Sequence, residues 1–296
     1  MNLISNQVKD IFAETDQESV SVTHNRAGNQ LHAFYVYNNH LRAEGGTNST
    51  MPIKLLNITT EEFETMTLFK YMSLPYAVDS IMKDTIWFSN PEKWKDPFES
   101  YFINNAYDKA DSPYDFPLKE HLFVCCFSTI SRSEAQWRMY SENNTSIMFD
   151  ISKNGLVQSL NQLSSEYDIY IGKAVYLPTT VLMSNDVSTI ISSMNYPSPN
   201  NDIEKALLLM LCKRKAFQYE SEVRVFLIPK DERSKKCNGV KVNVLLKNIT
   251  KRYTISPLLR KEEQLAIKEV LLSMNGVKNV SCATLYDPVI NKVLNW

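Results

Sequence analysis

Glycine is scarce in this chain, with seven glycines among 296 residues, which is about a third of the usual share. Neither G-x-G-x-x-G nor G-x-x-x-x-G-K-[ST] occurs. These are the two glycine-rich loops whose backbone amides cradle phosphate groups. Their absence argues against a nucleotide site built on a glycine-rich loop.

Histidine and cysteine are also few, and their spacing does not suit zinc. The four histidines show no H-x-x-x-H or H-E-x-x-H pattern, and none of the five cysteines forms a C-x-x-C pair. Structural and catalytic zinc sites usually draw on such closely spaced ligands. The odd number of cysteines, without a disulfide framework, predicts a reducing compartment.

An excess of charge of one sign and long apolar runs are missing as well. The net charge is −1, which gives no general electrostatic case for binding nucleic acid or a membrane; a nucleic-acid target remains open. No apolar run reaches the length that spans a bilayer, and the first residues lack a signal peptide. We therefore expect a cytoplasmic protein without a membrane partner.

The chain does contain many short strand patterns, among them residues 85–89, 123–128 and 146–151, mixed irregularly with helical ones. This mixture, without strict βαβ alternation, predicts an α+β fold of mixed short-stranded sheets with flanking helices around a cleft. Residues 44–50 have the composition of a flexible linker. We therefore expect an N-terminal appendage at residues 1–51, with a helix at 2–13 and a hairpin, followed by a main domain at residues 52–296.

A helix is predicted in the middle of the main domain, from Asp202 to Phe217. Its early acidic residues, its apolar positions at helical spacing and its final basic run Lys213-Arg214-Lys215 all favour a helix. The basic run is interpreted as a solvated helix face. This helix leads directly into the most informative strand pattern of the chain.

That strand pattern, at residues 219–227, alternates apolar and charged side chains. As a strand, it would have one apolar core face and one face with two carboxylates and a guanidinium. Burying such charges without partners costs free energy. The charged face is therefore either exposed, with an Arg–Glu pair, or it lines a site that uses its charges. The charged residues are Glu220, Glu222 and Arg224.

Other predicted strands end in polar or aromatic side chains. Lys70 and Tyr71 lie near the end of one strand, and Ser128 ends another. Trp137 and Tyr140 share a face of the helix that follows. Each group also has a simple structural interpretation, as a lysine stem packed on the surface or as an aromatic core cluster.

Six motifs follow in order along the main domain: Phe69-Lys70-Tyr71, Ile86-Trp87-Phe88-Ser89, Lys95-Asp96-Pro97-Phe98-Glu99, Cys126-Phe127-Ser128, Trp137 with Tyr140, and Glu220-Ser221-Glu222-Val223-Arg224. Together they resemble a bacterial family known as domain of unknown function 2971. The resemblance covers roughly residues 65–290 and departs from the family pattern at Phe69 and Lys95. Because family members occur among mobile and phage-defence genes, it implies a defence or toxin-like role.

A looser resemblance is to ADP-ribosyltransferases, whose opening strand and helix, Ser-Thr strand and late [Gln/Glu]-x-Glu pair look like segments of this chain. It implies cleavage of NAD as a substrate. One of Glu220 and Glu222 would stabilise an oxocarbenium-like transition state, and the other would orient or deprotonate the acceptor. A lysine in the first motif departs from the usual arginine or histidine. The implied NAD-binding residues are Lys70, Tyr71, Ser128, Trp137, Tyr140 and Arg224.

Two other classes of function fit the same residues. A metal-dependent nuclease would gather Asp96, Glu99, Glu220 and Glu222 around Mg²⁺, whereas the transferase needs no metal. Against the nuclease, Arg224 stands where a lysine is more usual and the net charge is not basic. The third class is a non-catalytic sensor or binding module of a defence system, with a regulatory protein partner and a purely structural Arg–Glu pair.

Overall fold

The computed structural model describes residues 53–287, apart from residues 95, 105–106, 110–111, 115–117, 185, 195, 197–198 and 232–236, and only three short strands before residue 53. Strands β1 (Val20–Val22), β2 (Ala33–Tyr37) and β3 (His40–Ala43) pair antiparallel in that order. The helix predicted at 2–13 and Lys95 of the third motif lie outside the described residues.

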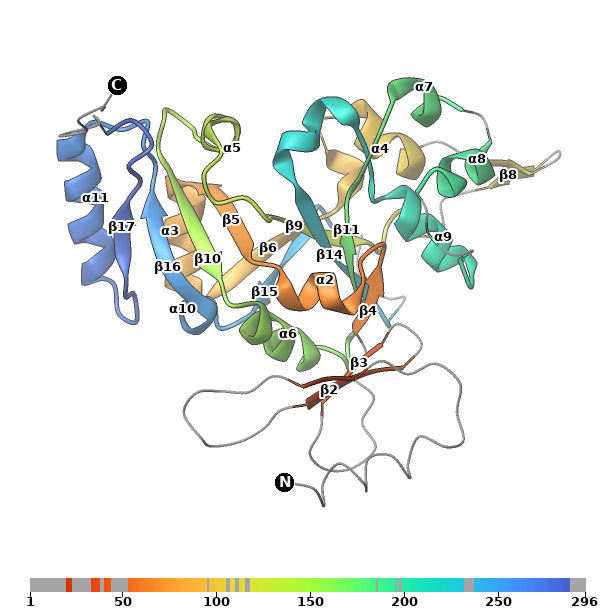
Figure 1. Ribbon diagram of the computed structural model, residues 1–296, viewed down its shortest axis with the longest axis horizontal. Coiled ribbons are helices and arrows are strands. Elements are labelled where there is room, and N and C mark those ends of the chain that lie inside the picture. Colours follow the sequence, from red (N-terminus) through yellow and green to blue (C-terminus); the bar gives the residue numbers. More distant parts are fainter. Residues whose placement is uncertain are drawn as a thin grey trace, which may run out of the picture.

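The described chain is a mixed α+β fold, as the sequence predicts, and is built on one large open sheet (Figure 1). The further strands are β4 (Ile53–Leu56), β5 (Leu68–Ser73), β6 (Thr85–Ser89), β7 (Tyr107–Lys109), β8 (Ser112–Tyr114), β9 (Phe123–Ser128), β10 (Ser146–Ile151), β11 (Tyr167–Lys173), β12 (Val175–Leu177), β13 (Cys212–Arg214), β14 (Glu222–Pro229), β15 (Gly239–Asn243), β16 (Thr250–Ile255) and β17 (Val280–Cys282). The main path through the sheet is β1-β2-β3-β4-β11-β14-β9-β5-β10-β16-β17.

The sheet divides at β9. One edge of β9 pairs with β14 from Phe123 to Ser128. The other edge is shared, because Ser128 pairs with Phe69 of β5 whereas Val124 pairs with Ser89 of β6. Strand β6 continues to β15. The sheet therefore forks between β5 and β6, and the middle of β9 is left without a strand partner on that edge.

Helices lie on both faces of the sheet. They are α2 (Thr60–Thr65), α3 (Leu74–Lys83), α4 (Pro97–Asn104), α5 (Glu134–Met139), α6 (Lys153–Asn161), α7 (Thr179–Leu182), α8 (Val187–Ser192), α9 (Asp202–Leu209), α10 (Leu246–Ile249) and α11 (Lys261–Ser273), with 3₁₀ turns η1 (Pro91–Lys93) and η2 (Lys215–Glu220). In Figure 1, α4, α7, α8 and α9 gather beside β11 and β14, and α11 lies at the opposite end, beside β17. None of the described helices has both the length and the apolar character that a bilayer crossing requires.

Strand β14 shows what each face of the sheet buries. Val223 and Leu227 belong to the large core cluster that also contains side chains of α3, α6 and α10. Phe226, on the opposite face, belongs to a second cluster with side chains of α4, α8 and α9. Glu222 and Arg224 share the face of Phe226 and are also buried. The charged face is therefore not exposed, and its charges need partners.

The helix predicted from Asp202 to Phe217 is twice as long as the observed helix. Helix α9 ends at Leu209, and the chain then forms β13, which pairs in parallel with β12. Pairing with β12 satisfies the backbone here, so tertiary context overrides the helical pattern. The interpretation of the basic run as a solvated face is wrong for Lys213, which lies in β13 and is 6% exposed. The observed strand β14 begins at Glu222, three residues later than predicted. Glu220 is the last residue of η2 and does not belong to the strand.

Candidate functional site

A cleft of about 610 Å³ opens at the fork of the sheet. We call it the fork cleft. A narrow recess of about 10 Å³ lies beside it, and the two share five lining residues. The cleft lining comes from β5, β6, the η1–α4 segment, β9, α5, β13, η2 and β14: Lys70, Trp87, Ser89, Trp94, Asp96, Pro97, Glu99, Val124, Cys125, Cys126, Met139, Tyr140, Lys213, Arg214, Phe217, Glu220, Glu222 and Arg224.

Lys70 lies at the point where β5 and β6 separate. The backbone carbonyl of Cys126, in the middle of β9, has no strand partner on this edge, and Lys70 Nζ donates a hydrogen bond to it at 2.8 Å. A buried carbonyl without a partner would cost free energy. Lys70 thus supplies the missing donor at the fork and places a positive charge there. Its side chain lines both the cleft and the recess.

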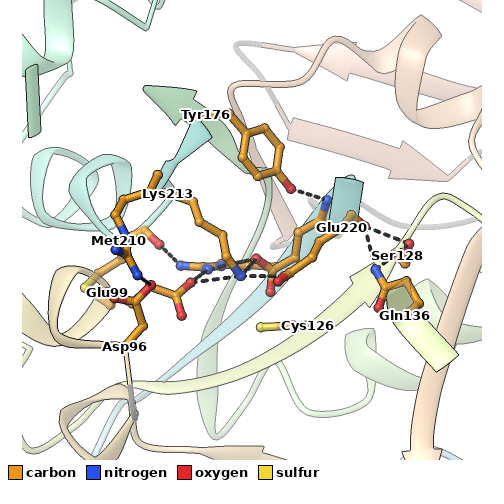
Figure 2. A network of polar contacts seen from close by, with 12 residues as sticks. Asp96, Glu99, Cys126, Ser128, Gln136, Tyr176, Met210, Lys213 and Glu220 are labelled. Carbon is orange, nitrogen blue, oxygen red and sulfur yellow. Dashed lines mark hydrogen bonds and ion pairs between the residues drawn. The ribbon is translucent and has the colours of Figure 1, made fainter. Parts of the chain in front are cut away.

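The cleft wall contains a buried charge network around Lys213 (Figure 2). Lys213 Nζ lies 2.5 Å from Glu220 Oε2, 3.1 Å from Glu99 Oε1 and 3.3 Å from Glu222 Oε2. All three carboxylates and the ammonium have side chains that are at most 13% exposed. Buried charges are tolerated when they are paired in this way.

Arg224 closes the network from the other side. Its guanidinium donates to Glu222 Oε2 from Nε at 3.2 Å and from Nη2 at 2.8 Å, to Glu99 Oε1, and to the backbone carbonyl of Met210 at 2.5 Å. The guanidinium also lies 4.7 Å from the ring centroid of Trp94. Arg224 is 1% exposed. It is therefore positioned to hold Glu222 and not to bind a ligand by itself.

A second pair extends the network toward the cleft mouth. Arg214 Nη2 donates to Asp96 Oδ2 at 3.0 Å, while Asp96 Oδ1 accepts from the backbone amide of Phe98 at 2.9 Å. Asp96 thus precedes α4 as a turn residue, and its second oxygen pairs with Arg214.

The position of Glu220 is fixed by hydrogen bonds to its backbone carbonyl. Its carbonyl accepts hydrogen bonds from Ser128 Oγ at 2.7 Å and from Gln136 Nε2 at 3.0 Å. Ser221 follows with φ of 45°, the left-handed conformation, and its carbonyl accepts from the amide of Thr129 at 2.9 Å. Such strain in a residue other than glycine is concentrated at functional sites. The turn lets Glu220 and Glu222 reach the same lysine.

The two glutamates have pKa values that move in opposite directions. Burial raises the pKa of Glu220 above its usual range, although Lys213 partly offsets this. Burial acts in the same sense on Glu222, but Arg224 and Lys213 outweigh it and bring its pKa down to about 2. Glu222 is therefore a fixed negative charge, and Glu220 is the carboxylate of the two that binds a proton more readily.

The predicted aromatic residues separate into two groups. Tyr140 lines the cleft and is 37% exposed, and burial together with the nearby carboxylates raises the pKa of its phenol. Trp137 is 1% exposed and packs edge-on against Tyr71, with ring centroids 4.9 Å apart. Trp137 thus belongs to a core cluster with Phe69 and Met148, and Tyr71 reaches only the recess.

All five cysteines are free thiols, and two of them line the cleft. Burial raises the pKa of Cys126 well above its usual range. A thiol that stays protonated is a poor nucleophile. Cys126 therefore contributes its backbone carbonyl to the site and carries no sign of thiolate chemistry.

Four residues of the site were missed by sequence reasoning or given another role. Lys213 and Arg214 were placed on a solvated helix, and Gln136 and Trp94 received no role in the site. A lysine and an arginine next to an apolar helix end look solvated unless the pairing of β13 with β12 is known. No local signal could have identified them.

The four carboxylates that the nuclease interpretation would place around Mg²⁺ do lie close together, but a lysine and an arginine side chain hold them. Lys213 contacts three of them, and Arg214 contacts the fourth, Asp96. Within the described part of the chain, no group of three or more acidic, histidine or cysteine side chains has the arrangement of a metal site. The cations already supply the charge that a metal ion would bring.

Residues 136–225 match a family that is described as a protein of unknown function, DUF2971. The matched segment begins at Gln136 and includes Lys213, Glu220, Glu222 and Arg224. The match therefore covers only part of the charged wall of the cleft, since Asp96 and Glu99 lie outside it. It adds no activity because the family's function is unknown. No curated protein matches the chain.

Proposed function

We propose that the fork cleft binds NAD, and that Glu220 and Glu222 promote cleavage of its nicotinamide–ribose bond with transfer of ADP-ribose to an acceptor or to water. One observation carries the proposal. Ser128 of β9 is the register partner both of Phe69 on β5 and of Glu222 on β14. The three strands whose motifs resemble those of ADP-ribosyltransferases are neighbours, and these positions lie on one line across the sheet.

The lining of the cleft suits a dinucleotide. Its volume of about 610 Å³ lies within the range of small-molecule sites, roughly 300–1,000 Å³. Trp87, Tyr140 and Phe217 line it and offer flat apolar surfaces for the adenine and nicotinamide rings. Lys70 adds a positive charge for a ribose hydroxyl or a phosphate.

The pKa values assign a role to each glutamate. The C1′–N bond breaks with its electron pair leaving on nicotinamide, so positive charge develops on the ribose. Glu222, permanently ionised, stabilises this charge from a site of low dielectric constant. The nucleophile then forms the new bond to C1′, and its proton passes to Glu220, whose raised pKa suits a general base.

The test incubates the purified full-length protein with NAD and measures the release of nicotinamide by chromatography. Glu220→Gln removes the base and is expected to lower the rate by about 10²–10⁴. Glu204→Gln is the matched control, because Glu204 is a buried carboxylate of α9 that does not line the cleft. It is expected to leave the rate unchanged. Labelled NAD shows whether ADP-ribose goes to water or to a protein.

Two results would overturn the proposal. If NAD and ADP-ribose neither bind nor react, the cleft has another ligand. If the protein instead cleaves a nucleic acid only with Mg²⁺ or Mn²⁺, and Glu220→Gln abolishes this, the nuclease is correct. A role in phage defence or as a toxin is part of the proposal and is supported only by the resemblance to the family.

A further inference from the structure

We propose that Arg214 is a phosphate anchor of the fork cleft, and that the ligand of the cleft carries a phosphate group. This inference rests on the proposed function for the identity of the ligand as a pyrophosphate-containing nucleotide. Arg214 lies in β13, lines the cleft, and has a side chain that is 29% exposed. Glu222 and Arg224, in contrast, are almost fully buried.

Two aromatic rings fix the plane of this guanidinium. Its central carbon lies 4.6 Å from the ring centroid of Phe98 on α4 and 5.0 Å from that of Phe217 on η2. An arginine that packs against two rings loses little further side-chain freedom when it binds a ligand, and its planar edge remains available for hydrogen bonds. These ring contacts thus hold a positive charge ready at the wall of the cleft.

The hydrogen bonds of Arg214 are incomplete. Asp96 accepts from Nη2 at 3.0 Å, and Asp96 is itself fixed by the amide of Phe98. The Nε atom is buried, and no residue in the described part of the chain accepts a hydrogen bond from it. A buried donor without an acceptor costs free energy. Asp96 therefore does not use all the donors of Arg214, and the terminal N–H groups of its partly exposed side chain remain for an oxygen of a ligand.

Phosphate fits this group better than a neutral ligand does. A guanidinium binds phosphate oxygens with paired, charge-assisted hydrogen bonds, and lysine cannot reproduce this geometry. The chain has no glycine-rich phosphate loop, so a phosphate in this cleft needs side-chain donors. Lys70 lines the same cleft and supplies a second positive charge.

The test measures binding by calorimetry with four probes: ADP-ribose, NAD, inorganic pyrophosphate and adenosine. Arg214→Ala is expected to weaken ADP-ribose, NAD and pyrophosphate about tenfold to a hundredfold and to leave adenosine unchanged. Arg214→Lys keeps the charge and is expected to lie between the wild type and Arg214→Ala. Arg138→Ala is the control, because Arg138 also pairs with a carboxylate but lies on α5 outside the cleft.

Each outcome decides between the two proposals. Equal affinity of wild type and Arg214→Ala for ADP-ribose overturns the anchor and leaves NAD as the ligand. Arg214-dependent binding of pyrophosphate without binding of NAD or ADP-ribose supports the anchor and overturns the proposed function. Failure of the wild-type protein to bind any of the phosphate compounds overturns the anchor. If Arg214→Ala does not fold, Arg214→Lys supplies the same comparison, with a smaller loss of affinity expected because it keeps the charge.

Discussion

Two buried lysines of this protein have similar surroundings at first sight. Lys213 is 6% exposed and Lys153 is 9% exposed, and each ammonium lies just over 5 Å from a phenylalanine ring centroid. Lys213 contacts three carboxylates beside the cleft. Lys153 instead donates to the backbone carbonyls of Phe63 and Glu64, at 2.6 and 2.5 Å, where α2 ends, and it pairs with one carboxylate, that of Glu64, at 3.3 Å.

The partners decide what each lysine does. Burial opposes both ammonium charges, but the carboxylates around Lys213 outweigh it and raise its pKa, whereas burial dominates at Lys153 and lowers its pKa. Lys153 satisfies carbonyls that a helix end leaves unpaired. Lys213 concentrates negative charge at a cleft. Burial of a charge therefore does not indicate function by itself. Function is indicated by the partners of the charge and by a cleft next to it.

The largest effect on stability is expected when the charge network loses a cation. Arg224→Met leaves Glu99 and Glu222 buried with Lys213 alone, and breaking a buried pair typically costs about 3–5 kcal/mol. Urea unfolding at neutral pH measures this loss. Arg138→Met, which removes an exposed arginine, is expected to keep the wild-type midpoint. A loss below about 1 kcal/mol in Arg224→Met would show that water already reaches these carboxylates.

A smaller loss is expected at Lys153. Lys153→Met removes the donor of the Glu64 carbonyl and one of the two donors of the Phe63 carbonyl, whose other donor is the amide of Met66 at 3.3 Å. This loss costs about 1–3 kcal/mol. Because Lys153 does not line the cleft, the rate of nicotinamide release by folded protein is expected to stay unchanged. A lower rate in Lys153→Met, at a temperature where circular dichroism shows it to be folded, would contradict the distinction between the two lysines.

A loss of about 1 kcal/mol in the free energy of unfolding is expected when the backbone amide of Glu222 loses its hydrogen-bond acceptor. Tyr176 on β12 accepts a hydrogen bond from the amide of Glu222 at 2.8 Å, and Tyr176→Phe leaves that amide without its acceptor. Urea unfolding checks the loss. Tyr76→Phe, at an exposed position of α3, is the control and is expected to have no effect. Equal stability of both variants would mean that a water replaces the hydroxyl.

Local patterns predicted much of the fold. The strands at 85–89, 123–128 and 146–151 have the predicted limits, because runs of apolar and β-branched residues fix strands locally. Ser133 caps α5 by accepting a hydrogen bond from the amide of Gln136. The fork at β9 could not be predicted, since it depends on pairing between residues that are far apart in the sequence.

The site was predicted in part for the same reason. Glu220, Glu222 and Arg224 do converge, although Glu220 belongs to η2 and not to the strand. Their position next to Ser128 follows from the register of β9 and β14. Lys213 was missed because its role depends on the parallel pairing of β13 with β12, which no periodicity in the sequence indicates.

The smallest expected effect is a difference in how stability depends on alkaline pH. For Lys153 the pKa of the folded state lies below the usual 10.5. Between these two values the unfolded chain holds a proton that the folded chain has lost, so the free energy of unfolding rises with pH. For Lys213 the pKa of the folded state lies above 10.5, so its contribution is lost only above that pH.

Urea unfolding from pH 7 to pH 10.5 tests this difference, with wild type and Lys153→Met measured in parallel. The stability of the wild type relative to Lys153→Met is expected to increase with pH, by less than about 1.4 kcal/mol per pH unit. Lys83→Met, at an exposed position of α3, is expected to follow the wild type. A difference that decreases with pH would mean that the α2 carbonyls and Glu64 hold Lys153 charged, and that the two lysines are alike after all.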